Sequence, residues 1–199
     1  MSLPGGPGGR NPTLVLVVAS TGGPAALLEI LRHIVKPMLP MIVAQHMPAD
    51  QTKGFAMHLA EQSRLTVVEA GAGALPPGDV VVLRGGGDYR LFRGETGLVA
   101  RLAPAAHTPF HPNGDTLLRS AAAASIPAGC VVLSGMGQDG AAGAAALASS
   151  GMPVLLQAFG TCVVPGMPQA TAASVPGARA LSPASIAARL NAWARLEAA

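Results

Sequence analysis

The sequence predicts an α/β fold, a three-layer α/β/α sandwich built on a mostly parallel, doubly wound sheet. Short continuous apolar runs, such as Leu14–Ala19 and Val80–Leu83, fit strands that are buried on both faces. These runs alternate with helical patterns along most of the 199 residues, and that alternation is typical of a parallel sheet covered by helices on both faces. The length suffices for one domain with a large core.

The expected elements follow one another in regular order. The first strand, Leu14–Ala19, leads into a helix over residues 25–36 that Pro24 opens, because proline is favoured at the first helical position. Ser182 is expected to cap the last helix, with Pro183 at its first position. Between them we expect strands at 41–45, 65–70, 80–83, 130–134 and 154–158, a hairpin from 89–92 and 98–102, and helices at 49–63, 116–125, 141–149 and 168–174.

Residues 1–12 are rich in glycine and proline, so we expect a flexible leader or linker remnant there and a folded domain over residues 13–199. The leader lacks the apolar stretch of a signal peptide, and no apolar run is long enough to cross a bilayer. The chain has only two cysteines, which suits a reducing compartment. These features predict a cytoplasmic protein without membrane insertion.

The scarcity of charged residues and the spacing of possible metal ligands exclude further classes of protein. Charged residues make up 12% and aromatic residues 3% of the chain, and Arg and Lys are scattered along the sequence, so no nucleic-acid-binding stripe is expected. His107 and His111 have a helical metal-ligand spacing, but Pro109 between them argues against a helix. Cys130 and Cys162 lack a metal-binding spacing. The spacing of these residues therefore predicts no metal site.

Three polar residues follow expected strands, at the edge where ligands bind in open α/β sheets. Ser20 follows the first strand, His46 follows the second, and Asp139 lies in the loop after the strand at 130–134. They are a candidate triad in which Ser20 attacks an acyl carbon, His46 takes its proton and Asp139 orients the imidazole. Gly22 and Gly23 leave room for the acyl group, and the helix behind them offers N–H groups to an oxyanion.

Each of the three also has a simpler structural interpretation. Ser20 and Asp139 are residue types that commonly cap helices, and both precede an expected helix. His46 could be a histidine that is hydrogen-bonded at a strand end, without a role in chemistry. The residues alone leave these interpretations open.

A dinucleotide-binding site is a further alternative. The segment from Gly135 to Gly140 reads G-x-G-x-x-G between an expected strand and an expected helix. The ribose-binding acidic residue expected about 20 positions later is missing, because no Asp or Glu lies between Gly140 and Glu197. The motif is therefore a weak indication by itself.

Four segments resemble the catalytic domain of the chemotaxis protein-glutamate methylesterases, the CheB family. In chain order they are VVASTGGPAAL at 17–27, VAQHMPAD at 43–50, VVLSGMGQDGAAG at 131–143 and CVVPGMPQA at 162–170. The resemblance implies a three-layer α/β/α domain that hydrolyses methyl esters of glutamates on chemoreceptors, with deamidation of receptor glutamines as a further activity of the family. It implies no metal or cofactor.

By motif position, the resemblance makes Ser20 the nucleophile, His46 the general base and Asp139 the orienting acid. It also places Thr21 in the same pocket and makes the backbone N–H of Met136 a candidate oxyanion donor. The implied partners are methylated cytoplasmic helices of a chemoreceptor or related signalling protein, and a receiver domain on the parent chain or in trans. The alternative functions are a catalytically idle receptor-docking module and a dinucleotide-binding domain.

One block departs from the family pattern. The usual His-Arg-Pro-Ser-x-Asp is altered over residues 111–115, where Asp115 is kept and the Arg and Ser are replaced. The change lies outside the candidate triad. We therefore expect it to affect receptor contacts or loop order rather than the chemistry.

Overall fold

The computed structural model describes residues 10–105 and 108–197, so most of the expected leader and His107 lie outside the described residues. The described residues form a seven-stranded sheet in the order β10-β9-β8-β1-β2-β5-β3, and all its neighbouring strands are parallel. The α/β prediction is confirmed. The strands are β1 (Leu14–Ala19), β2 (Met41–Gln45), β3 (Val67–Ala70), β5 (Val80–Leu83), β8 (Ala128–Val132), β9 (Val154–Gln157) and β10 (Arg179–Leu181).

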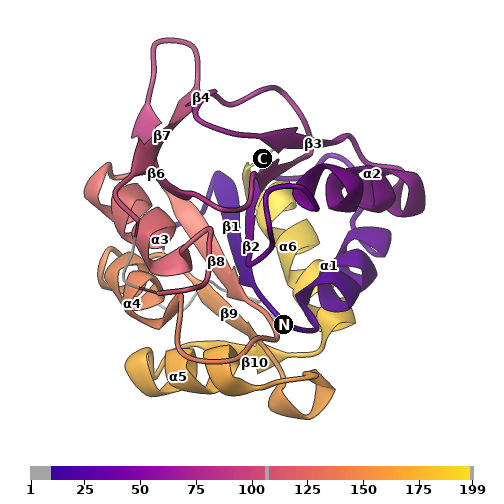
Figure 1. Cartoon of the computed structure of the whole chain (residues 1–199). Helices are drawn as coiled ribbons and strands as arrows, with labels where there is room; N and C mark the ends of the chain where they lie inside the picture. Colours follow the sequence, from indigo (N-terminus) through magenta and orange to yellow (C-terminus); the bar gives the residue numbers. More distant parts are fainter. Residues whose placement is uncertain (1–9, 106–107, 198–199) are drawn as a thin grey trace.

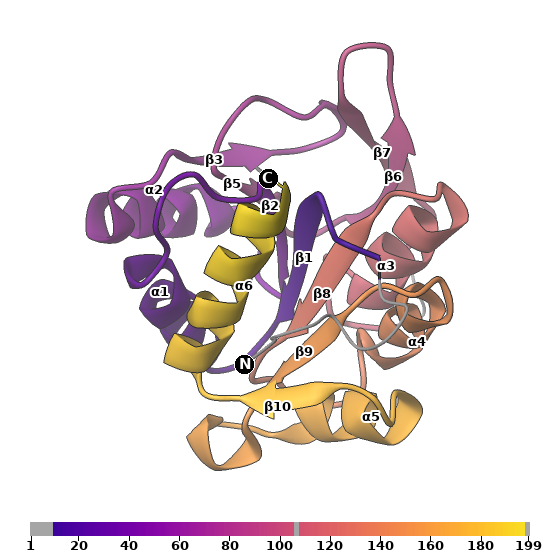
Figure 2. The same cartoon turned by 180° about the vertical axis from the view of Figure 1, so that it is seen from behind.

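Helices cover both faces of this sheet (Figures 1 and 2). One layer holds α1 (Gly23–Arg32), α2 (Thr52–Ser63) and α6 (Pro183–Glu197), and the other holds α3 (Gly114–Ala123), α4 (Ala141–Ser149) and α5 (Gly166–Ser174). Side chains of β1 alternate between the two layers. Val15 and Val17 pack with α1 and α6, whereas Leu16 and Val18 pack with α3 and α4. This two-sided burial explains why the strand reads as a continuous apolar run.

A small antiparallel sheet lies beside α3 (Figure 1). It contains β4 (Gly73–Ala74), β7 (Leu98–Ala103) and β6 (Asp88–Arg93), in that order. β6 and β7 are the hairpin that the sequence predicts. β4 and β10 were not predicted, because each is only two or three residues long and mostly exposed, and so carries no apolar run.

Helix boundaries differ from the expected ones by a few residues. α1 ends at Arg32 instead of extending to residue 36, and Lys36 precedes Pro37, a position that disfavours helical backbone. α3 begins two residues early, because the Asn113 side chain accepts a hydrogen bond from the Thr116 N–H and caps the helix. Ser182 caps α6 as predicted, since its hydroxyl accepts from the Ser185 N–H at 3.2 Å. None of the described helices is long and apolar enough to cross a membrane.

The strand order places the candidate residues at one edge. β1 lies between β2 and β8, and the chain leaves β1 through α1 on one face but reaches β8 through α3 on the other. The carboxyl ends of β1, β2 and β8 therefore meet where the crossover connections change face. Ligands bind at such a switch point in open α/β sheets.

Candidate active site

Ser20 stands at the end of β1, held by backbone contacts. Its N–H donates to the Ser134 carbonyl at 3.0 Å, and its own carbonyl accepts from Gln45 Nε2 at 3.0 Å. The N-cap of α1 is Gly22, with φ of 84°, and no side chain caps that helix. The N-cap interpretation of Ser20 is therefore wrong. A Cβ on Gly22 would lie 2.6 Å from Ser134 Oγ, so both conformation and space require glycine there.

His46 follows β2 and is held through both its backbone and its ring. Its backbone N–H donates to the Ala19 carbonyl at 2.9 Å, which ties the end of β2 to the end of β1. Nε2 lies 2.7 Å from Oδ2 of Asp139, and the ring stacks on Phe110 with centroids 5.4 Å apart. The side chain is 4% exposed, and its Nδ1 is buried without a hydrogen bond to any described residue. Nδ1 is thus the ring nitrogen left to exchange a proton.

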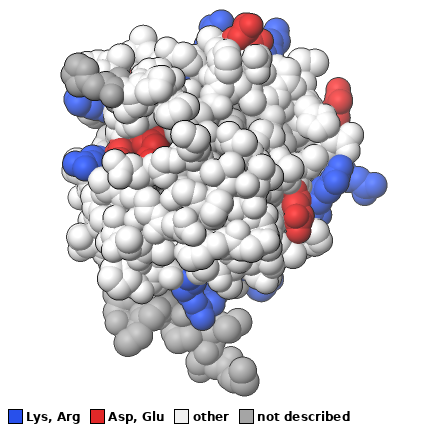
Figure 3. Space-filling model, turned by 60° about the horizontal axis from the view of Figure 1, so that its bottom comes forward, with Lys and Arg blue, Asp and Glu red and all other residues white. Residues whose placement is uncertain are grey.

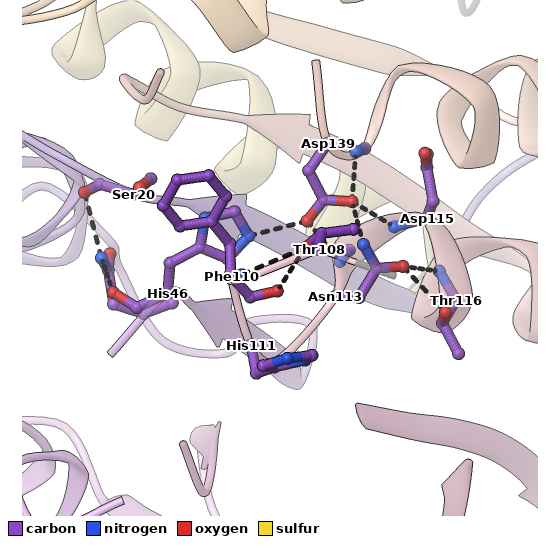
Figure 4. Close-up of polar contacts among 12 residues, drawn as sticks. Ser20, His46, Thr108, Phe110, His111, Asn113, Asp115, Thr116 and Asp139 are labelled. Carbon is purple, nitrogen blue, oxygen red and sulfur yellow. Dashed lines mark hydrogen bonds and ion pairs between the residues drawn. The ribbon is translucent and has the colours of Figure 1, made fainter. Parts of the chain in front are cut away.

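Asp139 is the most heavily hydrogen-bonded side chain of the site (Figure 4). Besides His46, the described residues that donate to its carboxylate are Asn113 through Nδ2 and Gly114, Asp115 and Gly140 through backbone N–H groups, at 2.6–3.0 Å. Burial raises the pKa of Asp139, but the hydrogen bonds from His46, Asp115 and Gly114 outweigh it, and the net pKa is lowered. The residue is therefore a carboxylate at neutral pH.

The same contacts show whether Asp139 caps the helix that follows it, α4. The N-cap of α4 is Gly140, with φ of 88°, and no side chain caps that helix. Asp139 instead binds the first N–H groups of α3, Gly114 and Asp115. It therefore stabilises the amino end of a helix that precedes it in sequence, and the capping of α4 that its position suggests is wrong.

A cavity of about 340 Å³ joins Ser20 and His46. Asp139 lies behind the His46 ring, on the side of α3 (Figure 4). Thr21 lies on the cavity wall. Ser20, Thr21, His46, Met47, Pro48, Gly86, Pro109, Phe110 and His111 line the cavity.

Among the described residues, Met136, unlike Thr21, does not line the cavity with its side chain. That side chain is 64% exposed. Its backbone, however, passes beside the serine, because a Cβ on the preceding Gly135 would lie 2.7 Å from the Ser20 Cβ. The Met136 N–H donates to no described residue. The group free to bind a ligand at this residue is thus the backbone N–H.

The segment 110–115 supplies contacts that the sequence did not reveal. Phe110 packs on His46, and Asn113 donates to Asp139. Asp88 of β6 anchors the segment, since its Oδ1 accepts from His111 Nδ1 at 2.8 Å and from the Asn113 N–H at 2.6 Å. Only Asn113 had a detectable signal, because Asn before an expected helix is a typical N-cap.

Within the described ranges, no group of three or more His, Cys, Asp or Glu side chains could hold a metal ion. The Asp139 carboxylate lies where the G-x-G-x-x-G segment would have to approach a pyrophosphate, so its charge opposes dinucleotide binding. Burial raises the pKa of both Cys130 and Cys162, which disfavours a thiolate nucleophile.

Comparisons with known proteins find one family repeatedly. The CheB methylesterase family matches residues 15–190. A protein-glutamate methylesterase/protein-glutamine glutaminase of Saccharophagus degradans is 41% identical over 80% of this chain and 44% of its own length. Another, from Anaeromyxobacter dehalogenans, is 40% identical over 92% of this chain and 54% of its own length. The chain thus spans about half the length of these curated relatives.

A solved structure matches the fold closely. The CheB methylesterase catalytic domain of Thermotoga maritima superposes with a TM-score of 0.83 at 30% identity. The match covers 92% of this chain and 99% of the other. The two chains therefore share one fold over most of this chain and nearly all of the other.

Proposed function

The chain belongs to the CheB methylesterase family, and from this premise we propose that it is a serine-type protein-glutamate methylesterase. Ser20 is its nucleophile, His46 its general base and Asp139 its orienting acid. The observation that carries the proposal is the short His46–Asp139 contact beside a cavity that Ser20 also lines. Deamidation of glutamine side chains is the second activity that the names of the relatives suggest for the same residues.

The chemistry proceeds in two halves. Ser20 Oγ attacks the ester carbonyl while its proton passes to His46 Nδ1, the ring nitrogen that Asp139 does not use. The C–O bond to the methoxy group then breaks, the imidazolium returns the proton, and methanol leaves a glutamyl ester on Ser20. In the second half, water gives a proton to His46 and attacks this ester. The bond between the acyl carbon and Ser20 Oγ then breaks and the imidazolium returns the proton to Oγ, which releases the glutamate and restores the Ser20 hydroxyl.

Asp139 supports both halves. Its carboxylate holds the proton of Nε2, which keeps Nδ1 free to accept the serine proton, and its negative charge stabilises the imidazolium that forms. The contacts from α3 hold this carboxylate at a fixed position and in its charged form. The stacked Phe110 ring limits rotation of the imidazole.

The oxyanion of each tetrahedral intermediate needs a donor beside Ser20. We assign this role to the Met136 N–H, because it has no partner among the described residues and follows Gly135, which lies against Ser20. Any side chain on Gly135 would also collide with Met167 Sδ. The close approach of this loop to the nucleophile therefore depends on glycine.

The face around the cavity suits an apolar part of a protein substrate. Exposed Phe110, Met136 and Val163 lie in loops near the carboxyl edge of the sheet, and exposed Phe159 begins a short 3₁₀ helix, Phe159–Thr161, after β9. Figure 3 shows this side of the molecule with charged side chains mainly near its rim. We therefore propose that methylated helices of a chemoreceptor contact this face mainly through apolar side chains.

Methanol release from a methylated chemoreceptor tests the function. The unsubstituted chain should release methanol, Ser20→Ala should not, and Ser150→Ala should match the unsubstituted chain, because Ser150 is an exposed residue at the end of α4. Equal release by Ser20→Ala would overturn the triad. Specific receptor binding without methanol release by the unsubstituted chain would favour the docking module.

A further inference from the structure

A second hollow lies away from the catalytic cavity, between β6 and α3. Its volume is about 580 Å³, and it shares no lining residue with the cavity beside Ser20. β6 is an edge strand of the small sheet, and α3 runs beside it (Figure 1). The Leu91 N–H on the free edge of β6 donates to Ser120 Oγ at 2.9 Å, so a hydrogen bond joins the two walls. The hollow is thus a groove whose two walls, β6 and α3, are joined by this hydrogen bond.

Arginines that are scattered in the sequence gather around this groove. Arg90 of β6 and Arg119 of α3 are exposed and line it from opposite walls. Arg101 pairs with Arg90 across the hairpin, which places both on the same face of the small sheet. Arg93, at the end of β6, donates to the Ser125 carbonyl just beyond α3. The fold therefore places two guanidinium groups on the groove, those of Arg90 and Arg119, with Arg93 and Arg101 elsewhere on the β6–β7 hairpin.

These charges are not fully neutralised by acidic side chains. None of the four arginines forms an ion pair with any described residue. Asp115, one turn before Arg119 on α3, attracts it electrostatically, but Asp115 Oδ1 accepts from the Gly143 N–H at 2.6 Å. Glu95, in the turn of the hairpin, also forms no ion pair with a described residue. The groove thus carries a net positive charge, of which Asp115 offsets a part through its attraction to Arg119.

The floor of the groove is apolar. Phe92, Ala123 and Ala124 contribute to it, and the Arg101 guanidinium lies 4.8 Å from the centre of the Phe92 ring. Guanidinium groups bind carboxylates through two parallel hydrogen bonds, and an aromatic residue between arginines is typical of protein interfaces. A polymer of phosphates alone would leave this apolar floor without a matching group.

We propose that this groove binds an acidic polypeptide segment. Its carboxylates pair with Arg90 and Arg119, and an apolar side chain of the segment packs on Phe92 and the two alanines. The site is separate from the catalytic cavity, so a bound segment leaves access to Ser20 open. The proposal is independent of the catalytic assignment, because the groove shares no lining residue with the cavity beside Ser20.

Fluorescence anisotropy with the full chain tests this site. The probe is a labelled peptide that alternates Glu and Leu, and the control peptide has Lys in place of Glu. We expect the acidic peptide alone to bind, and to bind at least about tenfold more weakly when the salt concentration rises from about 0.05 to about 0.5 M.

Charge reversal then locates the site. Arg90→Glu with Arg119→Glu should weaken binding at least about tenfold. Lys53→Glu with Arg195→Glu changes the net charge equally on exposed positions of α2 and α6, and it should bind as the unsubstituted chain does. Equal weakening by both pairs, or no binding of the acidic peptide, would overturn the proposal. So would tighter binding of a single-stranded oligonucleotide that is lost with the same two arginines. Unchanged thermal unfolding shows that the variants are folded.

Discussion

Nε2 of His46 lies 2.7 Å from Oδ2 of Asp139, and this contact joins the loops that follow β2 and β8. The contact fixes which imidazole nitrogen holds its proton toward the carboxylate. Nδ1 is consequently the nitrogen that can serve Ser20. The proposed mechanism depends on these different roles of Nε2 and Nδ1 more than on any other geometric feature.

Asp139→Asn should remove the orienting charge while it keeps the shape of the side chain. An amide can donate to Nε2, which would leave the proton on Nδ1, where it blocks proton transfer from Ser20. We expect turnover of a glutamyl methyl ester to fall by about 10²- to 10⁴-fold, as for triads of this kind. Steady-state methanol release measures this. Asp79→Asn, at a surface ion pair with Lys36, is the control and should retain full turnover.

Phe110→Ala should free the His46 ring without removing a catalytic group. The lost stacking contact should lower turnover of a small methyl ester by about three- to tenfold, because pairs of rings contribute about 0.5–1.5 kcal/mol. Phe159→Ala is a matched control, since Phe159 is similarly exposed but does not line the cavity. If both variants kept full turnover, the stacked ring would have no positioning role.

Asp88→Asn should loosen the segment that carries Phe110 and Asn113. The buried Asp88 carboxylate accepts from His111 Nδ1 and the Asn113 N–H, and weakening such bonds costs about 1–3 kcal/mol. Urea unfolding should show a loss of this size, together with lower esterase turnover. Unchanged stability and turnover would show that Asp88 does not anchor the segment.

Stability should fall at acid pH, in part through Asp139. Its pKa is lowered in the folded chain from the ordinary 3.8, so its contribution is present above that value and is lost as pH falls through the folded pKa. Burial raises the pKa of Asp115, whose contribution therefore has the opposite sign. Urea unfolding from about pH 6 to about pH 3 should show a shallower loss of stability for Asp139→Asn. An equal or steeper loss would contradict the lowered pKa.

Much of the fold could be predicted because burial on both faces leaves a clear pattern. Leu14–Ala19 and Met41–Gln45 are entirely buried strands, and both were predicted to the residue. The Arg179–Leu181 strand lies at the sheet edge with exposed side chains, so hydrophobicity could not reveal it. Helix ends depended on single capping contacts such as that of Asn113, which shifted them by a few residues.

The candidate site was predictable to a lesser degree. Ser20, His46 and Asp139 could be found because each follows an apolar strand, and parallel strands bring their carboxyl ends together. The pairing of Asp88 with His111 spans 23 positions and joins the hairpin to an irregular loop. No periodic pattern relates such segments, so contacts of this kind follow only from the folded chain.

Covalent labelling by an alkyl phosphonate ester tests the nucleophile most directly. Such a reagent reacts with an activated serine and remains attached, so mass spectrometry of the digested protein identifies the residue. The account predicts a single label on Ser20, its loss in Ser20→Ala, and much slower labelling of Ser20 in His46→Ala. A label on another residue, or equal labelling rates with and without His46, would contradict it.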